Sequence, residues 1–242
     1  MSKKAEQKKI LAIMAHPDDA EITCCGTLAL YANSGNVVTI ATFTNGCAGV
    51  PEKKPQQVAA IRKKEAASSA ATIGAKYICC DVDDECVFPN EKQRNIMIDL
   101  LRQCDPDIIF THSPNDYHPD HTYVSQLVFD SYFQKGLACI KGPKVPCCRF
   151  GGTQIYYVEP IAGIEFMPSE YVDITSVMDI KRQMLLCHKS QFSTMKDLAK
   201  TDMIELIDVQ SRFRGFQAGC KHAEGFKRFN AYQRGITTRI LP

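Results

Sequence analysis

Four short apolar runs in the first half of the chain constrain the fold most, because each is followed by a segment of helical length. The runs are KILAIMA, VVTIATFT, KYICCDV and DIIFTHS. The segments that follow them have helical spacing of apolar residues, and we expect helices over residues 21–35, 56–74, 90–104 and 122–136. Strands that alternate with helices through short loops favour an α/β fold with a mostly parallel sheet, flanked by helices on both faces.

The last third of the chain has a mixed pattern. Residues 153–159 and 170–175 are predicted as strands, and residues 176–192 and 203–220 as helices. No repeat, low-complexity tract or linker interrupts the sequence. We therefore expect one domain over residues 1–242, with residues 1–8 as a flexible N-terminus.

Composition excludes several classes of protein. The 242 residues are 45% hydrophobic and 23% charged, as in ordinary globular proteins. A net charge of +2 gives no electrostatic reason to expect nucleic acid or an anionic membrane as partner. The polar start is unlike a signal peptide, and no run is long enough to span a bilayer, so we expect a cytoplasmic protein. The oligomeric state is left open, a homo-oligomer included.

The twelve cysteines do not form a recognisable framework. Three adjacent pairs occur, but none has the CxxC spacing of a zinc clamp. In a cytosolic chain of this length, buried reduced thiols are expected rather than disulfides.

Polar segments follow three of the predicted strands. AHPDDAE follows the first strand, TNGCAG follows the second, and HSPNDYHPDH follows the run DIIF. Ligands of such folds bind outside the carboxyl ends of the strands. We therefore expect these three segments to converge at one edge of the sheet.

Two of these segments pair histidine with carboxylates at short spacing. His16 and Asp19 are three residues apart, as are His118 and His121, and side chains at this spacing in a turn share a face. Two imidazoles and one carboxylate, with positions left for water, describe a catalytic zinc site, and iron(II) suits the same ligands. We predict His16, Asp19 and His121 as the metal ligands.

Three further residues beside this site have roles available. A carboxylate such as Asp18 or Asp120 can take the proton of a metal-activated water, and an imidazole such as His118 can stabilise an oxyanion. A simpler role for Asp18 is a helix N-cap, which does not exclude catalysis. His112 is expected to support the loop rather than bind metal. Metal-assisted hydrolysis is the reaction class that these residues indicate.

The same residues carry a family resemblance. AHPDDAE, TFTNG, RKKEAASSAATIGA, DIIFTHSPNDYHPDH, HKSQ and HAEGF, in this order, resemble the motifs of the LmbE/PIG-L family of metal-dependent N-deacetylases. The resemblance covers roughly residues 8–230. It implies a Rossmann-like fold, a zinc ion, and removal of acetyl from an N-acetylglucosamine-type amino sugar.

The resemblance also assigns roles residue by residue. His16, Asp19 and His121 match the family's metal ligands, and Asp18 matches its general base. His118 matches the residue that stabilises the oxyanion or acts as acid, and Asp120 the carboxylate that orients it. Arg62 matches an arginine that contacts substrate, although RKKE could equally be a solvated helix face. One departure is that the family's glycine pair is replaced here by Cys25-Gly26.

Other candidate contacts rest on loop position alone. Asn45 and Asp116 lie in loops that could reach sugar hydroxyls. His188 and His222 belong to the C-terminal motifs, and their sequence context does not decide between a surface and a core position. Glu21 has no clear role, and DVDDE is expected to be a solvated loop that could line the same site.

The leading hypothesis is a zinc-dependent N-deacetylase acting on an amino sugar or its conjugate. An amidase acting on a thiol-sugar conjugate would use the same machinery. A non-catalytic sugar- or metal-binding protein of the same fold is the alternative from another class, and Asp18 weighs against it because a binder needs no base. A dinucleotide-dependent enzyme is disfavoured, because HPDD stands where GxGxxG would be expected.

Overall fold

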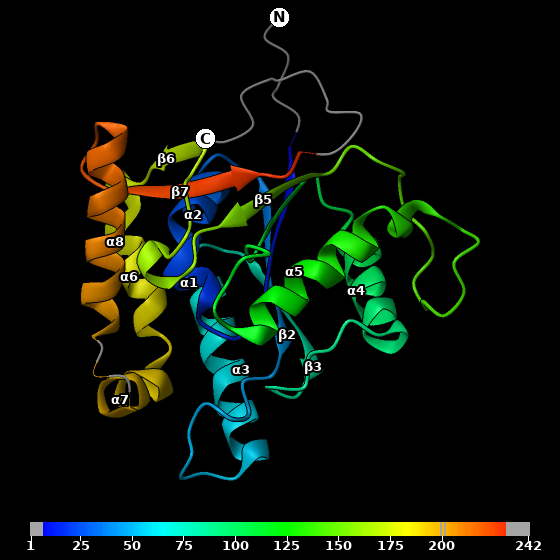
Figure 1. The fold of residues 1–242 in the computed structure, drawn as a ribbon, viewed down its shortest axis with the longest axis horizontal. Coiled ribbons are helices and arrows are strands. Elements are labelled where there is room, and N and C mark those ends of the chain that lie inside the picture. The colour runs from blue at the N-terminus through cyan, green and yellow to red at the C-terminus, as the bar shows by residue number, and fades with distance from the viewer. Residues whose placement is uncertain (1–6, 199, 201, 231–242) are drawn as a thin grey trace, which may run out of the picture.

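A seven-stranded sheet forms the centre of the protein, in the order β3-β2-β1-β4-β5-β7-β6 (Figure 1). The computed structural model describes residues 7–198, 200 and 202–230. Strands β1 to β5 are parallel, whereas β7 is antiparallel to both of its neighbours. The strands are β1 (Lys9–Met14), β2 (Val37–Thr44), β3 (Lys76–Val82), β4 (Ile108–Thr111), β5 (Gln154–Val158), β6 (Glu170–Asp173) and β7 (Ala223–Arg228).

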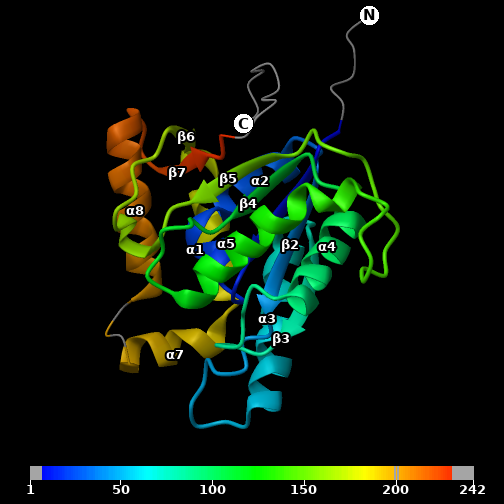
Figure 2. The same cartoon turned by 45° about the vertical axis from the view of Figure 1, so that its right-hand side comes forward.

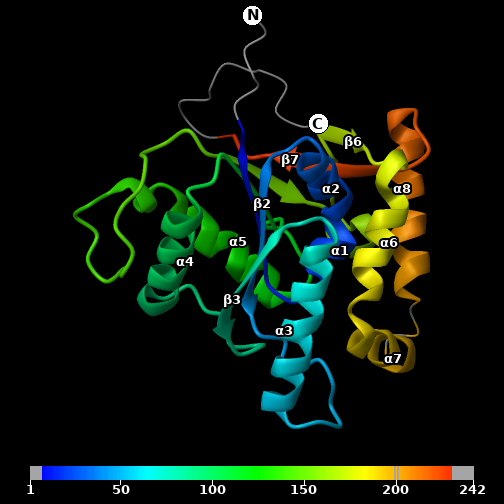
Figure 3. The same cartoon turned by 180° about the vertical axis from the view of Figure 1, so that it is seen from behind.

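Helices cover both faces of this sheet, as the turned views show (Figures 2 and 3). The predicted fold class, an α/β fold with a mostly parallel sheet, is confirmed. The helices are α1 (Asp19–Thr23), α2 (Cys25–Asn33), α3 (Pro55–Thr72), α4 (Glu91–Cys104), α5 (Pro119–Tyr132), α6 (Met178–Leu186), α7 (Lys189–Leu198) and α8 (Met203–Ala218).

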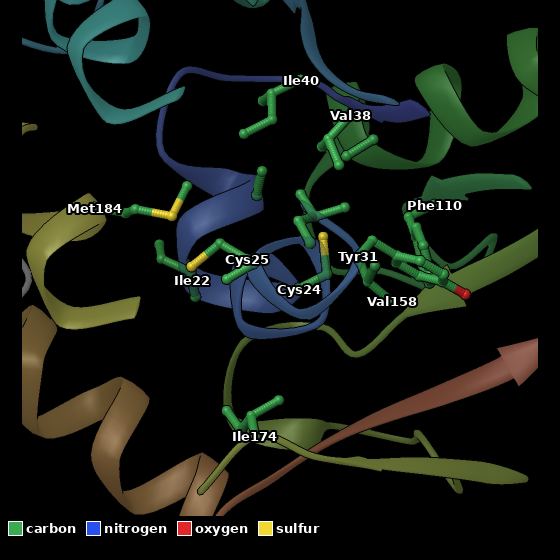
Figure 4. Packing of buried hydrophobic residues seen from close by; sticks show 14 of the residues in the cluster. Ile22, Cys24, Cys25, Tyr31, Val38, Ile40, Phe110, Val158, Ile174 and Met184 are labelled. Atoms are coloured by element: carbon green, nitrogen blue, oxygen red, sulfur yellow. The ribbon is translucent and has the colours of Figure 1, made fainter. Parts of the chain in front are cut away.

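Strand β1 shows why the sheet is buried on both sides. Its alternate residues Ile10, Ala12 and Met14 belong to one hydrophobic cluster, with α2 and α6. Leu11 and Ile13 belong to a second cluster, with α4 and α5. Successive side chains of a strand point to opposite faces, so a run of apolar residues without alternation is what a doubly covered strand requires. Figure 4 shows part of the first cluster, where Cys24 and Cys25 pack as small apolar side chains.

Two helices that the sequence predicts as continuous are broken in the structure. The segment 21–35 divides at Cys24, whose φ of −142° ends α1 before α2 begins. The segment 176–192 divides near His188, so that α6 and α7 are separate. Apolar periodicity could not show either break, because both sides of each break are buried against the same core.

The C-terminal part of the described chain contains one strand that the sequence reading did not assign. The segment AEGFKR forms β7 and lies between β5 and β6.

Among the described residues, no helix is long and apolar enough to cross a membrane. All twelve cysteines lie among the described residues and are free thiols. Of the expected flexible N-terminus, residues 1–6 lie outside the described residues, and the single domain stays a prediction.

Candidate active site and metal centre

The candidate site lies where β1 and β4 end, as the sequence predicts for a parallel sheet. The chain leaves β1, turns at His16 and Pro17, and enters the short helix α1 at Asp19. The second histidine segment follows β4 and enters α5 at Pro119, with His118 as its N-cap. The two turns bring His16 and His121 together, although they are 105 residues apart in sequence.

Three predicted ligands face one another across this site. Nδ1 of His16 lies 3.3 Å from Nε2 of His121. One carboxylate oxygen of Asp19 lies 3.4 Å from Nδ1 of His16, and the other lies 3.4 Å from Nε2 of His121. All three side chains are nearly buried. The structure therefore brings together the three residues predicted from sequence as metal ligands, and one possible ligand atom from each lies within 4.8 Å of the others.

These separations suit a small tetrahedral cation. Bonds of about 2.0–2.1 Å to a tetrahedral zinc ion would place the ligand atoms roughly 3.3–3.4 Å apart. The separation of 3.3 Å between the two nitrogens falls in this range, and each nitrogen lies 3.4 Å from one of the two oxygens of Asp19. Two nitrogens and a carboxylate are also the donor set of catalytic zinc sites, in which the fourth position is left for water or substrate.

Each histidine ligand has a carboxylate behind it. Nε2 of His16 lies 3.3 Å from an oxygen of Asp120, and Nδ1 of His121 lies 3.1 Å from Asp116. Such outer carboxylates fix the ring orientation and increase the basicity of the metal-binding nitrogen. Both carboxylates are therefore placed differently from what the sequence predicts. Asp120 was expected to orient His118, and Asp116 was expected to contact a sugar.

The carboxylates also make the site favour positive charge. Burial alone would lower the pKa of His16, but hydrogen bonds with Asp120 and Asp19 outweigh it and raise the pKa to about 10. Burial is likewise outweighed at His121, where Asp19 and Asp116 raise the pKa to about 9. The pKa of Asp19 is well below its usual range because the histidines overcome the effect of burial. A cation would be stabilised by the same charges.

Removal of the carboxylate behind His121 should weaken metal binding. We expect Asp116→Asn to raise the zinc dissociation constant by about 10- to 100-fold, because an amide is a weaker acceptor for the imidazole N–H. Competition with a chromophoric chelator measures this change. Asp130→Asn, further along α5, is the control and should bind zinc as the wild type does. An unchanged affinity of Asp116→Asn would show that Asp116 does not support the ligand.

Asp18 has an unusual backbone conformation for a non-glycine residue. Its φ is 118° and ψ is −21°, in a region that favours glycine. It occupies the N-cap position of α1, but its side chain makes no capping hydrogen bond. Strained residues of this kind persist where the surrounding structure imposes them, often at functional sites. The conformation points to a role beyond helix capping.

Arg62 holds the carboxylate of Asp18 in place. Its guanidinium lies 3.2 Å from Asp18 and also donates to the carbonyl oxygen of Pro17. Gly46 and Gly49 make room for it, since a Cβ atom at either would lie 2.7 or 2.6 Å from the arginine side chain. Arg62 is buried, so it is not a solvated helix-face arginine. Burial raises the pKa of Asp18 to about 6 against the lowering effect of Arg62.

His118 is oriented by a backbone amide rather than by the Asp120 carboxylate. Its Nδ1 accepts a hydrogen bond from the N–H of Asp120 at 3.2 Å. A nitrogen that accepts cannot carry the proton in neutral imidazole, so the proton is on Nε2. Nε2 lies 3.5 Å from the exposed carboxylate of Glu85, on the open side of the site. A half-buried N–H donor is thus available beside the metal ligands.

His112 supports the ligands from behind. Its Nε2 accepts a hydrogen bond from the N–H of Ala15 at 2.9 Å, and its ring stacks on His121 at 3.8 Å. Burial and the neighbouring His121 lower its pKa to about 4, which keeps it neutral. The supporting role of His112 stays a prediction.

Other predicted contacts are engaged within the protein. Asn45 donates to Asp83 and accepts from the N–H of Cys47, so both ends of its amide hold the loop. Glu21, which had no role in the sequence, is buried, accepts from Ser69 and lies 3.2 Å from Nε2 of His188. His188 and His222 are both buried. The pair of Glu21 and His188 joins distant segments, and such a pair leaves no local signal in the sequence. Its formation could therefore not be predicted.

The sequence signature of one known family fits this description of fold and site. The family described as PIG-L: GlcNAc-PI de-N-acetylase matches residues 11–132, about half of the chain. The chain belongs to this family, so the predicted resemblance and the predicted class of enzyme, an N-deacetylase that hydrolyses an amide bond, are confirmed. The matched region contains every residue of the metal centre.

Individual relatives extend the similarity over most of the chain. Diacetylchitobiose deacetylase of Thermococcus kodakarensis is 27% identical over 247 residues, which cover 97% of this chain and 86% of the relative. A 4-oxalmesaconate hydratase of Pseudomonas putida is 26% identical over 195 residues, covering 76% and 74%. The structure of N,N'-diacetylchitobiose deacetylase from Pyrococcus horikoshii with its inhibitor MPG has a TM-score of 0.79 at 26% identity, covering 93% and 84%.

Proposed function

We propose that this protein is a zinc-dependent deacetylase that removes an acetyl group from an N-acetylglucosamine-type amino sugar or its conjugate. The observation that carries the proposal is the convergence of His16, Asp19 and His121, whose possible ligand atoms, one from each residue, all lie within 4.8 Å of one another. Asp18 directly precedes the carboxylate ligand, and the ring of His118 lies 4.7 Å from that of His121. A base and an N–H donor therefore accompany the ligands.

The residues of the site divide the work of amide hydrolysis. A zinc ion held by the three ligands would polarise the amide carbonyl and lower the pKa of water. Asp18 takes the proton from the attacking water, since its buried carboxylate directly precedes Asp19 and is held by Arg62. The N–H of His118 donates to the oxygen that becomes negative as the tetrahedral intermediate forms. Asp18 then returns the proton to the leaving amine.

The amino-sugar substrate is supported by the relatives. Diacetylchitobiose and an inositol glycoside of N-acetylglucosamine are the substrates named for two deacetylase relatives. Asp18 supports an enzyme over a binding protein, because its conformation is strained and its carboxylate is fixed without serving as a cap. Iron(II) would suit the same ligands and is a second metal to load. A cytoplasmic location and a homo-oligomeric state stay predictions.

A panel of substrates tests the activity. Zinc-loaded protein should bind about one metal ion per chain and release acetate from at least one of N-acetylglucosamine, N,N'-diacetylchitobiose, and the inositol and malate glycosides of N-acetylglucosamine. Acetate and free amine are measured together, so that hydrolysis of the amide is distinguished from other reactions. Protein that binds metal but releases no acetate from any of them would favour the binding-protein alternative.

A further inference from the structure

The junction between α1 and α2 is held by a buried ion pair from distant parts of the chain. The ammonium of Lys181 in α6 lies 2.6 Å from the carboxylate of Glu224 in β7. Both side chains are almost fully buried. No part of the proposed reaction uses either residue, and a buried ion pair stabilises poorly unless its remaining hydrogen-bonding atoms are satisfied.

This ion pair satisfies the helix ends at the junction. Lys181 donates to the carbonyl oxygen of Ile22 at 2.9 Å, near the end of α1. Glu224 accepts from the N–H groups of Gly26 and Thr27 at 3.0 and 2.8 Å, in the first turn of α2. These are groups that a helix leaves without partners at its ends. The charges also match the helix dipoles, with the cation at a C-terminus and the anion at an N-terminus.

The local sequence offers no substitute for these caps. The N-cap position of α2 is Cys24, which makes no side-chain capping hydrogen bond, whereas Ser, Thr, Asp or Asn would be usual. Gly26 allows the carboxylate to approach, because a Cβ atom there would lie 3.0 Å from Glu224 and 2.8 Å from Ile174. The glycine that the family pattern keeps at this point therefore serves the contact with Glu224.

Helix α1 depends on such contacts because it is very short. It has five residues, fewer than an isolated helix needs to be stable in water. It begins with the metal ligand Asp19, directly after Asp18. Any shift of α1 along its axis would move both carboxylates relative to His121, which α5 holds. Displacement of a reacting group by about 1 Å can cost on the order of 100-fold in rate.

We propose that Lys181 and Glu224 are positioning residues, which fix α1 and through it the carboxylates of Asp18 and Asp19. The inference rests on the proposed function for its kinetic consequence, but its effect on the metal site is independent of the substrate. Neither residue touches the reacting atoms. They hold the C-terminal end of α1, whereas the proposed ligand Asp19 lies at its N-terminal end.

Zinc affinity of matched variants tests this role. Lys181→Met should raise the zinc dissociation constant about tenfold or more, in the range found for residues that support ligands. Lys135→Met is the control, because Lys135 is also fully buried and bonds Asp105 at 3.3 Å and the Arg149 carbonyl at 2.9 Å. That lysine lies beyond the opposite, amino-terminal ends of the strands. The control should lose thermal stability but keep its zinc affinity within about twofold.

A second pair of variants covers the case in which loss of the charge prevents folding. Glu224→Asp keeps the charge but withdraws the carboxylate from Gly26 and Thr27, and Lys181→Arg keeps a cation near Ile22. Glu224→Asp should weaken zinc binding, and with an active substrate it should lower kcat while KM stays within about twofold. Lys181→Arg should retain more zinc affinity than Lys181→Met.

The outcomes separate this inference from the proposed activity. If the wild type binds zinc but releases no acetate, the proposed activity fails and the comparison of zinc affinities still decides the positioning role. If folded Lys181→Met and Glu224→Asp bind zinc as tightly as Lys135→Met does, the ion pair serves stability alone and the inference is wrong.

Discussion

Asp18→Asn is expected to lower kcat by about 10²- to 10⁴-fold, the usual contribution of a general base, while the metal content stays that of the wild type. The amide keeps the shape of the side chain but cannot accept the proton of the attacking water. Arg62 contacts the side chain at position 18 and also donates to the carbonyl oxygen of Pro17, which holds the preceding backbone, so the variant should fold. Acetate release and metal analysis on the same preparation measure both quantities.

The control for this variant is Asp84→Asn. Asp84 lies 3.9 Å from the same guanidinium of Arg62 but is not beside the metal ligands in sequence. Its loss should cost less than about tenfold in kcat, an effect of positioning only. If both variants lose activity equally, or if Asp18→Asn retains full activity, Asp18 is not the base.

The pH dependence follows from the same residue. Asp18 must be ionised to accept a proton, and its pKa is raised to about 6 by burial. Activity should therefore be constant above this pKa and fall about tenfold per pH unit below it. A bound cation would lower the pKa, so the acid limb lies at about pH 6 or below. The limb should be absent from the residual activity of Asp18→Asn.

His121→Ala is expected to abolish metal binding and activity together. The imidazole is one of the three proposed protein ligands, and its removal would leave Asp19 and His16 as the two that remain. The loss should exceed the roughly 100-fold that removal of a supporting carboxylate can cause. Metal analysis after dialysis, with circular dichroism to verify folding, measures the change.

His222→Ala is the matched control for this loss. His222 is also buried, but it lies before β7 rather than at the ends of β1 and β4. This variant should keep its zinc and most of its activity. Full metal content in folded His121→Ala would show that the three ligands are wrongly assigned.

The central parallel strands β1, β2 and β4 were predictable because nearly all of their residues are buried, on both faces of the sheet. Runs such as KILAIMA are apolar without alternation, and only a central parallel strand between two helical layers requires this. The antiparallel strand β7 gave no such signal, since AEGFKR mixes charged and apolar residues. Glu224 in this strand is charged because it caps a helix, and that need is visible only in three dimensions.

The candidate site was predictable where its residues are close in sequence. His16 with Asp19, and His118 with His121, each share one turn, so their convergence followed from the position of the strands. The pairing of outer groups was not predictable, because backbone conformation decides it. The backbone N–H of Asp120 donates to His118, and its carboxylate lies beside His16. This division depends on the backbone conformation in the first turn of α5, which the sequence does not specify.

The capping of α2 by Glu224 bears on when the site is completed during synthesis. The three proposed metal ligands lie within the first 121 residues, whereas the contact that closes the junction of α1 and α2 spans 198 residues. Contacts of such long range form late, because the loop between them must first be ordered. A nascent chain that has just released α5 holds every ligand but lacks the support of α1. If Lys181 and Glu224 position α1 as proposed, we expect tight metal binding only after β7 has joined the sheet.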